Sequence, residues 1–371
     1  MRPEELRAIT PALAKGTYLN FGAHGPSPRP VVEAAQEFLA EHEYDSAIGD
    51  DPYEAAYRAF DAARDPIATL LGCESAEIAL VESTTAGINA VANAVRWEPG
   101  DVVVRTDLEH PAGILPWRRL AQEGVKVRVV ETTDGRIDRD AFATAVSDAR
   151  LACFSALTWT HGTRLPVGDL VEIAHDAGAL ALVDAVQVPG HVSVDVSSWN
   201  ADVVAAAGHK WLLGLWGAGF MYVNQQRLDA FEPRTVGYRS VADPTAETVA
   251  YHPNASRFEV GSANPAPHVA LAEAIRLIEN VGLERIEERI QLLARRLIDG
   301  IPAERLLSPA EPESGLVTID VPDPTATVER CHDADVAIRE LPYPDAVRAS
   351  VHAVNTEADI DRLLGLLEPE W

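Results

Sequence analysis

The chain has 371 residues, 47% of them hydrophobic, which is enough to fill the cores of one large and one smaller domain, or of two comparable domains. Its formal net charge of -26 excludes a nucleic-acid surface, because such surfaces gather lysine and arginine against phosphates. No apolar stretch could span a bilayer, the N-terminus lacks a signal-peptide core, and the cysteines are too dispersed for a disulfide framework or a Cys-x-x-Cys metal site. We therefore expect a cytoplasmic protein with no membrane partner and no metal.

Between about residues 55 and 224, helical stretches alternate with short apolar runs, which is typical of an α/β domain with a mostly parallel sheet. The predicted strands are residues 77–81, 102–105, 125–130, 151–157, 180–183, 203–206 and 219–223. The predicted helices between them are residues 85–95, 116–123, 140–147 and 169–177. We expect the seven strands to form the sheet of a large domain.

The alternation stops after residue 224, and residues 233–267 are rich in proline and predict loops. Helices are then predicted at residues 269–279, 283–299 and 357–367, with strands at residues 315–320, 336–341 and 346–351. This pattern indicates a small α+β domain. The predicted division is an N-terminal segment, 1–20, that packs on the small domain, a large domain, 21–245, and the small domain, 246–371.

A phosphate anchor is the first candidate site along the chain. The predicted strand at residues 77–81 runs through Glu82 into Ser83-Thr84-Thr85, where a helix begins. The N-terminus of a helix presents free N–H groups and a positive dipole end to an anion, and Thr84 or Thr85 can add a hydroxyl donor. Serine and threonine at this position are also ordinary helix caps, so the segment alone leaves both interpretations open.

An acid and a lysine follow two later strands. Asp184 ends the apolar run 179–183, which places it at the carboxyl end of a strand, where open α/β sheets gather ligands. Lys210 follows the run 201–207 and is one of only three lysines in the chain. Asp184 alone would equally suit a turn or a helix cap, and a lysine in a turn is usually solvated. However, the other cations of this chain are nearly all arginines, which favours a chemical role for Lys210.

Together these residues match the needs of a pyridoxal cofactor. A lysine amine forms an imine with the cofactor's carbonyl, and an acid facing the pyridine nitrogen keeps the ring an electron sink. Lys210 and Asp184 can divide those tasks. By contrast, Gly214, Gly217 and Gly219 precede a predicted strand rather than a helix, so a dinucleotide-binding dehydrogenase is not indicated.

Several motifs in order resemble the class V aminotransferases, a pyridoxal-phosphate family that includes cysteine desulfurases, selenocysteine lyases and isopenicillin N epimerase. The motifs are Tyr18-Leu19-Asn20, Ser83-Thr84-Thr85, Glu109-His110 with Pro116-Trp117, Asp184-Ala185-Val186-Gln187, Gly208-His209-Lys210-Trp211-Leu212, and Val347-Arg348-Ala349-Ser350 with Asn355-Thr356. The resemblance covers almost the whole chain. It implies the aspartate-aminotransferase-like fold type I, pyridoxal 5'-phosphate as cofactor, and a homodimer whose active site is shared between subunits.

The resemblance also implies a role for each matching residue. Lys210 carries the cofactor and then serves as general base, Asp184 pairs with the ring nitrogen, and Gln187 hydrogen-bonds the ring oxygen. His110 stacks on the ring, although its place before Pro111 also suits a histidine that caps a turn. The phosphate contacts are Thr84 or Thr85, His209 and the partner subunit's Ser262. Arg348 binds the substrate carboxylate through two parallel hydrogen bonds.

Three departures bear on the reaction. Relatives that desulfurate cysteine carry a reactive cysteine shortly before the carboxylate-binding arginine, whereas residues 338–345 contain none and Cys331 lies upstream in a predicted helix. A serine common two residues before the histidine of the lysine motif is Ala207 here. Where many relatives have an asparagine near the substrate carboxylate, this chain has Trp159, which could narrow the pocket or stack on substrate.

We therefore predict an enzyme that acts at the α-carbon of an amino acid, with transamination to a keto acid as the first expectation. Epimerisation and loss of a β-substituent are the alternatives, and a desulfurase that forms a protein persulfide is disfavoured. A regulatory protein that retains the fold would bind the cofactor without removing an α-hydrogen from any amino acid.

The excess of acidic residues and the scarcity of lysine lead to a hypothesis that the surface is adapted to high salt, where counterions screen the repulsion among like charges. The thermal unfolding midpoint should then rise between dilute and molar salt. A midpoint and activity that are unchanged across that range would remove the support for this hypothesis.

Overall fold

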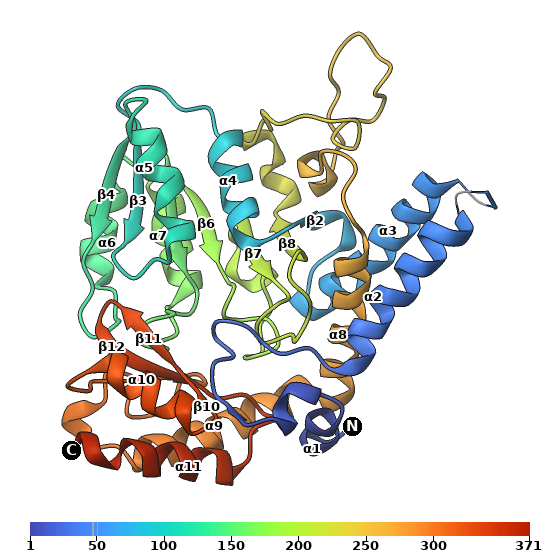
Figure 1. Ribbon diagram of the computed structural model, residues 1–371. Helices are drawn as coiled ribbons and strands as arrows, with labels where there is room; N and C mark the ends of the chain where they lie inside the picture. Colours follow the sequence, from blue (N-terminus) through green and yellow to red (C-terminus); the bar gives the residue numbers. More distant parts are fainter. Residues whose placement is uncertain (47, 50) are drawn as a thin grey trace.

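A computed structural model describes residues 1–46, 48–49 and 51–371 and contains a large lobe and a small lobe (Figure 1). The large lobe is built on a seven-stranded sheet of order β2-β8-β7-β6-β5-β3-β4. The strands are β2 Ile78–Val81, β3 Val102–Thr106, β4 Lys126–Val130, β5 Leu151–Ser155, β6 Leu180–Asp184, β7 Val203–Ala207 and β8 Gly219–Val223. Strand β8 is antiparallel to its neighbours β2 and β7, and the other pairs are parallel. The predicted mostly parallel sheet is confirmed.

Helices cover both faces of this sheet, which is why its strands are continuous apolar runs. In β6, Ala181 and Val183 pack into one core cluster, whereas Leu182 between them packs into the other. The first cluster takes in α3 Pro52–Leu71, α6 Arg139–Val146, α7 Val167–Asp176 and α8 Ala266–Val281; the second takes in α4 Thr84–Ala94 and α5 Leu115–Ala121. Ligand groups can therefore reach the sheet only at its strand ends.

The small lobe contains a separate three-stranded antiparallel sheet of order β11-β12-β9. Its strands are β9 Leu316–Ile319, β11 Arg339–Pro342 and β12 Asp345–Ser350, and its helices are α9 Leu283–Asp299, α10 Pro324–Asp333 and α11 Glu357–Leu367. All of these except β11 contribute side chains to a third core cluster. The single strand predicted at residues 336–341 is wrong. Two strands replace it, because β10 Val336–Ala337 pairs with the N-terminal β1 Thr17–Tyr18 while β11 pairs with β12.

The N-terminal segment begins with α1 Pro3–Ala8 and lies against the small lobe. It is held there by the β1–β10 pairing and by an ion pair of 2.9 Å between Arg7 of α1 and Asp359. Helix α8, which falls within the range predicted for the small domain, packs against α3 and α2 Arg29–Glu41 of the large lobe. The boundary at residues 245 and 246 stays a prediction. In the described part of the chain, every helix is too short or too polar to cross a bilayer.

Candidate active site

A cavity of about 550 Å³ lies where strands β5, β6 and β7 end. Eight of the ten predicted site residues line it: Thr84, Thr85, His110, Trp159, Asp184, Gln187, His209 and Lys210. The N-terminal residues Gly22, Ala23 and His24 and the small-lobe residue Arg339 also line it. The cavity is therefore assembled from the sheet, the chain start and the small lobe.

Lys210 stands just beyond the end of β7, in a turn fixed by main-chain hydrogen bonds of 2.9 Å from Gly208 N–H to the Ala218 carbonyl and from Gly214 N–H to the Gly208 carbonyl. The N-terminal segment approaches the turn so closely that a Cβ at Gly25 would lie 1.9 Å from the Lys210 carbonyl oxygen, so only glycine fits there. Burial lowers the pKa of the Lys210 amine to about 7, and the charge of Asp184 partly opposes that shift. A large share of this amine is neutral and nucleophilic near neutral pH.

Asp184 is the last residue of β6 and is almost fully buried. Burial raises the pKa of its carboxyl, while the Val186 N–H, which donates to Oδ1 over 2.9 Å, and the charge of Lys210 lower it. A buried carboxylate is costly unless a cation meets it. A protonated pyridine nitrogen in the cavity would supply that cation.

His110 caps a turn, and its predicted stacking on the cofactor ring stays a prediction. Its Nδ1 accepts a hydrogen bond of 3.2 Å from Ala112 N–H, so the ring caps the short 3-10 helix Pro111–Gly113 through an N–H group rather than a carbonyl. The same ring lines the cavity and meets Trp159 edge to face, with centroids 5.4 Å apart. Desolvation, with the positive charge of Lys210, lowers the pKa of His110 to about 4. The ring is therefore neutral at physiological pH and can stack on a cofactor.

The start of α4 fits a phosphate. Ser83 is the helix cap, since its Oγ accepts the Ala86 N–H over 3.1 Å. The Thr84 hydroxyl is thereby left free, and it is buried without a hydrogen-bond partner. Thr85 and His209 also line this part of the cavity, whereas Ala207 ends β7 with a buried methyl group. An unpartnered buried hydroxyl beside free helix N–H groups is what a bound phosphate would satisfy.

The Gln187 amide is already largely committed. Its Oε1 accepts the Trp211 indole N–H over 2.7 Å, and its Nε2 donates to the Gly22 carbonyl over 3.0 Å. One N–H of the amide therefore stays available for the predicted contact with the ring oxygen. Trp211 is itself stacked on His191 with centroids 3.5 Å apart. Trp211 belongs to the lysine motif, but the motif does not predict that the indole of Trp211 orients Gln187.

Arg348 is fully buried on β12 and is absent from the cavity wall. Its Nη1 donates to the Trp159 carbonyl over 2.7 Å, whereas Nε and Nη2 have no partner. The N-terminal segment lies directly against it, since a Cβ at Gly22 would lie 2.9 Å from Nη2. Burial and the nearby Arg339 lower the pKa of Arg348 to about 9. Its unsatisfied donors are suited to a carboxylate, and this role stays a prediction.

Arg339 lines the cavity and was not predicted from the sequence. Its guanidinium carbon lies 5.9 Å from the centre of the Trp159 ring. The only sequence signal is its position on the strand that precedes Arg348, which is weak in an arginine-rich chain. The cavity wall therefore includes a guanidinium other than that of Arg348, the one expected to bind the substrate carboxylate.

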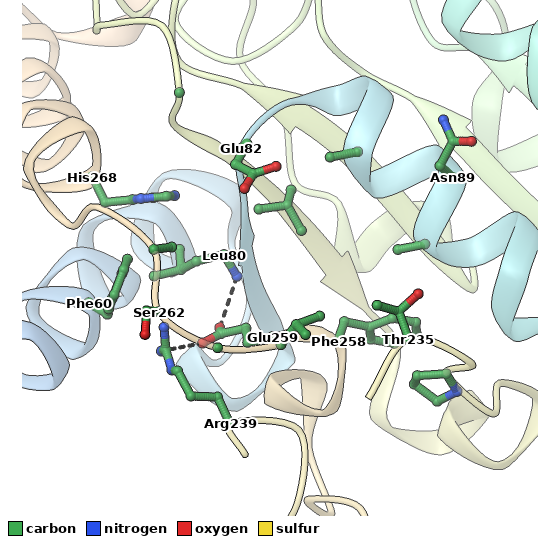
Figure 2. A pocket seen from close by; sticks show the side chains of 18 of the residues that line it. Phe60, Leu80, Glu82, Asn89, Thr235, Arg239, Phe258, Glu259, Ser262 and His268 are labelled. Carbon is green, nitrogen blue, oxygen red and sulfur yellow. Dashed lines mark hydrogen bonds and ion pairs between the residues drawn. The ribbon is translucent and has the colours of Figure 1, made fainter. Parts of the chain in front are cut away.

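Ser262 does not join the other site residues within one chain. It lines a second cavity of about 600 Å³, shown in Figure 2, and its hydroxyl lies 2.6 Å from the Tyr238 hydroxyl. The two cavities share only Glu82 and Gly217 in their walls. This placement is compatible with the expectation that Ser262 serves a partner's site, which stays a prediction.

The α/β sheet with Lys210, Asp184 and a helix N-terminus around one cavity defines a pyridoxal-phosphate enzyme of fold type I. The chain belongs to the family described as aminotransferase class-V, whose model matches residues 17–363. The predictions of family, fold and cofactor are thereby confirmed.

Two curated relatives and one solved protein show the range of activities among similar chains. The chain is 32% identical to a probable cysteine desulfurase of Methanothermobacter thermautotrophicus, over 99% of this chain and 98% of that one. It is 30% identical to the isopenicillin N epimerase of Streptomyces clavuligerus, over 95% and 94% of the two chains. It also matches the cystine C–S lyase C-DES, solved with its product cysteine persulfide, with a TM-score of 0.91 and 25% identity over 97% of this chain and 99% of that one. Another C-DES structure has glycine covalently linked to the pyridoxal-phosphate cofactor.

Proposed function

We propose that this enzyme is a lyase that breaks the C–S bond of an amino acid and releases the sulfur on a small molecule instead of passing it to a protein thiol. The observation that carries the proposal is that no cysteine is found among the described residues of the cavity wall. Desulfurase relatives support chemistry at sulfur, and the cystine C–S lyase neighbour supports release on a free product.

The position of each thiol supports this form of the reaction. The segment where desulfurases carry their cysteine is here a tight hairpin, in which Pro342 pairs with Asp345 across the turn between β11 and β12. Cys153 and Cys331 are fully buried. Burial raises the pKa of Cys73 to about 12, so its thiolate is scarce at neutral pH. A persulfide-forming nucleophile is not available near Lys210 in the described structure.

Two guanidiniums beside one cavity favour a substrate with two carboxylates. Arg348 has free donors for one carboxylate. Arg339 lines the cavity wall, and its guanidinium donates to the Glu340 carbonyl rather than to an acidic side chain. Arginine binds carboxylate through paired charge-assisted hydrogen bonds. Cystine, named for the C-DES neighbour, has two carboxylates and belongs to this substrate class.

The residues of this chain divide the work of such a reaction. Pyridoxal phosphate supplies an electron sink at the substrate α-carbon. Lys210, with its lowered pKa, takes the α-proton as a neutral amine, and Asp184 stabilises positive charge at the end of β6. Arg348 and Arg339 hold the carboxylates. The C–S bond then breaks with both electrons going to sulfur, so cystine and one water yield pyruvate, ammonia and cysteine persulfide.

Transamination is the second candidate, supported by the description of the family, and epimerisation is supported by the isopenicillin N epimerase relative. Incubation with cystine separates them. The lyase releases pyruvate and ammonia in equal amounts without an acceptor, an aminotransferase passes the amino group to an added keto acid and releases no ammonia, and an epimerase inverts an α-carbon and releases neither product. Absence of all three, and of α-hydrogen exchange, would instead indicate a binding protein.

The pH dependence of cofactor uptake follows from the lowered pKa of Lys210. The neutral amine is the reactive form, so uptake of pyridoxal phosphate by the cofactor-free protein should accelerate with rising pH and have a midpoint at about pH 7. A solvated lysine would put that midpoint at about pH 10. Since the charge of Asp184 raises the pKa of Lys210, Asp184→Asn should move the midpoint to lower pH. Growth of the visible absorbance measures the rate, and a wild-type midpoint near pH 10 would contradict a buried amine.

The three cysteines should be dispensable for catalysis. Cys73→Ala, Cys153→Ala and Cys331→Ala should each release pyruvate from cystine at a rate within about threefold of wild type, because none of these thiols takes part. Circular dichroism at the assay temperature checks that the two core variants are folded. A folded variant that loses about 100-fold or more in rate would indicate a protein persulfide and a desulfurase mechanism.

We also propose that the active form is a homodimer in which the Gly261-Ser262 turn serves the other subunit's phosphate site. Tyr238 and Val260, each 40% exposed beside this turn, form an apolar surface that a second copy could cover. Sedimentation should give the mass of two 40.0 kDa chains. A monomer that retains cofactor and full activity would exclude the shared site.

A further inference from the structure

Trp159 contacts the histidine that we expect to stack on the cofactor and both arginines that we expect to hold the substrate. Its ring meets His110 edge to face, its ring centre lies 5.9 Å from the Arg339 guanidinium carbon, and its carbonyl oxygen accepts a hydrogen bond of 2.7 Å from Arg348. The tryptophan therefore joins the ring-stacking histidine to both guanidiniums.

The turn that carries Trp159 is fixed between the two lobes. Thr158 N–H donates to the Thr163 carbonyl over 2.9 Å, and the Thr318 hydroxyl of β9 donates to the Thr160 carbonyl over 2.5 Å. At Gly162 the backbone has a φ of +72°, and a Cβ would lie 2.4 Å from the Leu316 carbonyl oxygen. Glycine is required there, and the indole is held at a fixed distance from β9 and its neighbours.

The two guanidiniums depend on Trp159 in different ways. Arg348 is bound by the main-chain oxygen, which any residue at position 159 would provide. Arg339 is partly exposed, and its Nε donates a long hydrogen bond of 3.3 Å to the Glu340 carbonyl. The face of the indole is a second restraint on its guanidinium, through a cation–π contact that a side chain without an aromatic ring could not make.

We propose that Trp159 is the specificity-determining residue of this cavity and gives it a preference for substrates with two carboxylates. Its indole holds Arg339 in position for the second carboxylate, while Arg348 takes the first. This inference rests on the proposed function, because it assumes that both guanidiniums meet the substrate.

The test uses ligands that lack an amine and so cannot react with the cofactor. Calorimetry on the cofactor-loaded protein compares dithiodipropionate, which has the skeleton and both carboxylates of cystine, with methylthiopropionate, which has one carboxylate. Wild type should bind the first more tightly. In Trp159→Leu the Kd of dithiodipropionate should rise about 5- to 30-fold, while that of methylthiopropionate changes less than about twofold. Trp159→Phe keeps an aromatic face, so the logarithm of its fold increase in the Kd of dithiodipropionate should be at most about half of that for Trp159→Leu.

Trp371→Leu, at the far C-terminus and outside the cavity wall, is the control and should leave both constants unchanged. If the Kd values of both ligands rose equally in Trp159→Leu, Trp159 would have only a structural role, and the inference would be overturned. Equal effects of leucine and phenylalanine, or a wild type without preference for dithiodipropionate, would also overturn it. Pyruvate release from cystine by wild type tests the lyase proposal separately. Failure of the lyase proposal is therefore distinguishable from failure of the role proposed for Trp159.

Discussion

Lys210→Ala should lower turnover about 10⁴-fold, because the variant loses both the covalent anchor of the cofactor and the general base. It should still bind pyridoxal phosphate, since the α4 N-terminus, Asp184 and Gln187 are unchanged. Dialysis should then remove the cofactor from the variant but not from wild type. The measurement is pyruvate release from cystine, together with the visible absorbance before and after dialysis.

Lys126→Ala is the matched control, because Lys126 is exposed on β4, outside the cavity wall. It should keep the wild-type rate and retain its cofactor through dialysis. A Lys210→Ala variant with substantial turnover, or with cofactor that resists dialysis, would show that another group is the anchor.

Asp184→Asn should lower kcat about 10²- to 10³-fold, with a smaller change in KM. The amide keeps the shape of the side chain but removes the buried negative charge, and breaking one member of a buried ion pair costs about 3–5 kcal/mol. The loss should appear mainly in kcat, because the charge on the ring nitrogen is needed at the step in which the α-proton leaves. Exchange of the substrate α-hydrogen with deuterated water should slow by a similar factor.

Asp195→Asn, an exposed aspartate that caps a turn, should leave both constants unchanged. If Asp184→Asn weakened cofactor binding but left α-hydrogen exchange intact in the loaded protein, the carboxylate would only position the cofactor. The electronic role assigned to Asp184 would then be wrong.

The sequence predicted the large sheet well because its strands are buried on both faces and therefore form compact apolar runs. Helices α9 and α11 occupy the residues that their amphipathic patterns predicted. Helices α2 and α3 were not predicted individually, although α3 is bounded by clear signals. Asp51 accepts the Tyr53 N–H over 2.8 Å as its cap, and Gly72 ends it at a φ of 70°. Recognition of that cap and glycine would have found the helix.

The candidate site was predictable where a residue type and a strand end coincide, as at Asp184 and Lys210. It was less predictable where burial depends on distant segments. Arg348 loses its exposure because Gly22 and Trp159, from two remote parts of the chain, lie against it. The hydrogen bond from Trp211 to Gln187 is likewise a tertiary contact without a local pattern.

The central claim is that pyridoxal phosphate is held covalently by Lys210. Its most direct test is borohydride reduction of the purified enzyme, followed by peptide mass spectrometry. With only three lysines in the chain, there are few competing positions. We expect the visible band to disappear and the pyridoxyl group to be found on the peptide that contains Lys210. An unlabelled protein, or a label on Lys15 or Lys126 instead, would contradict this claim.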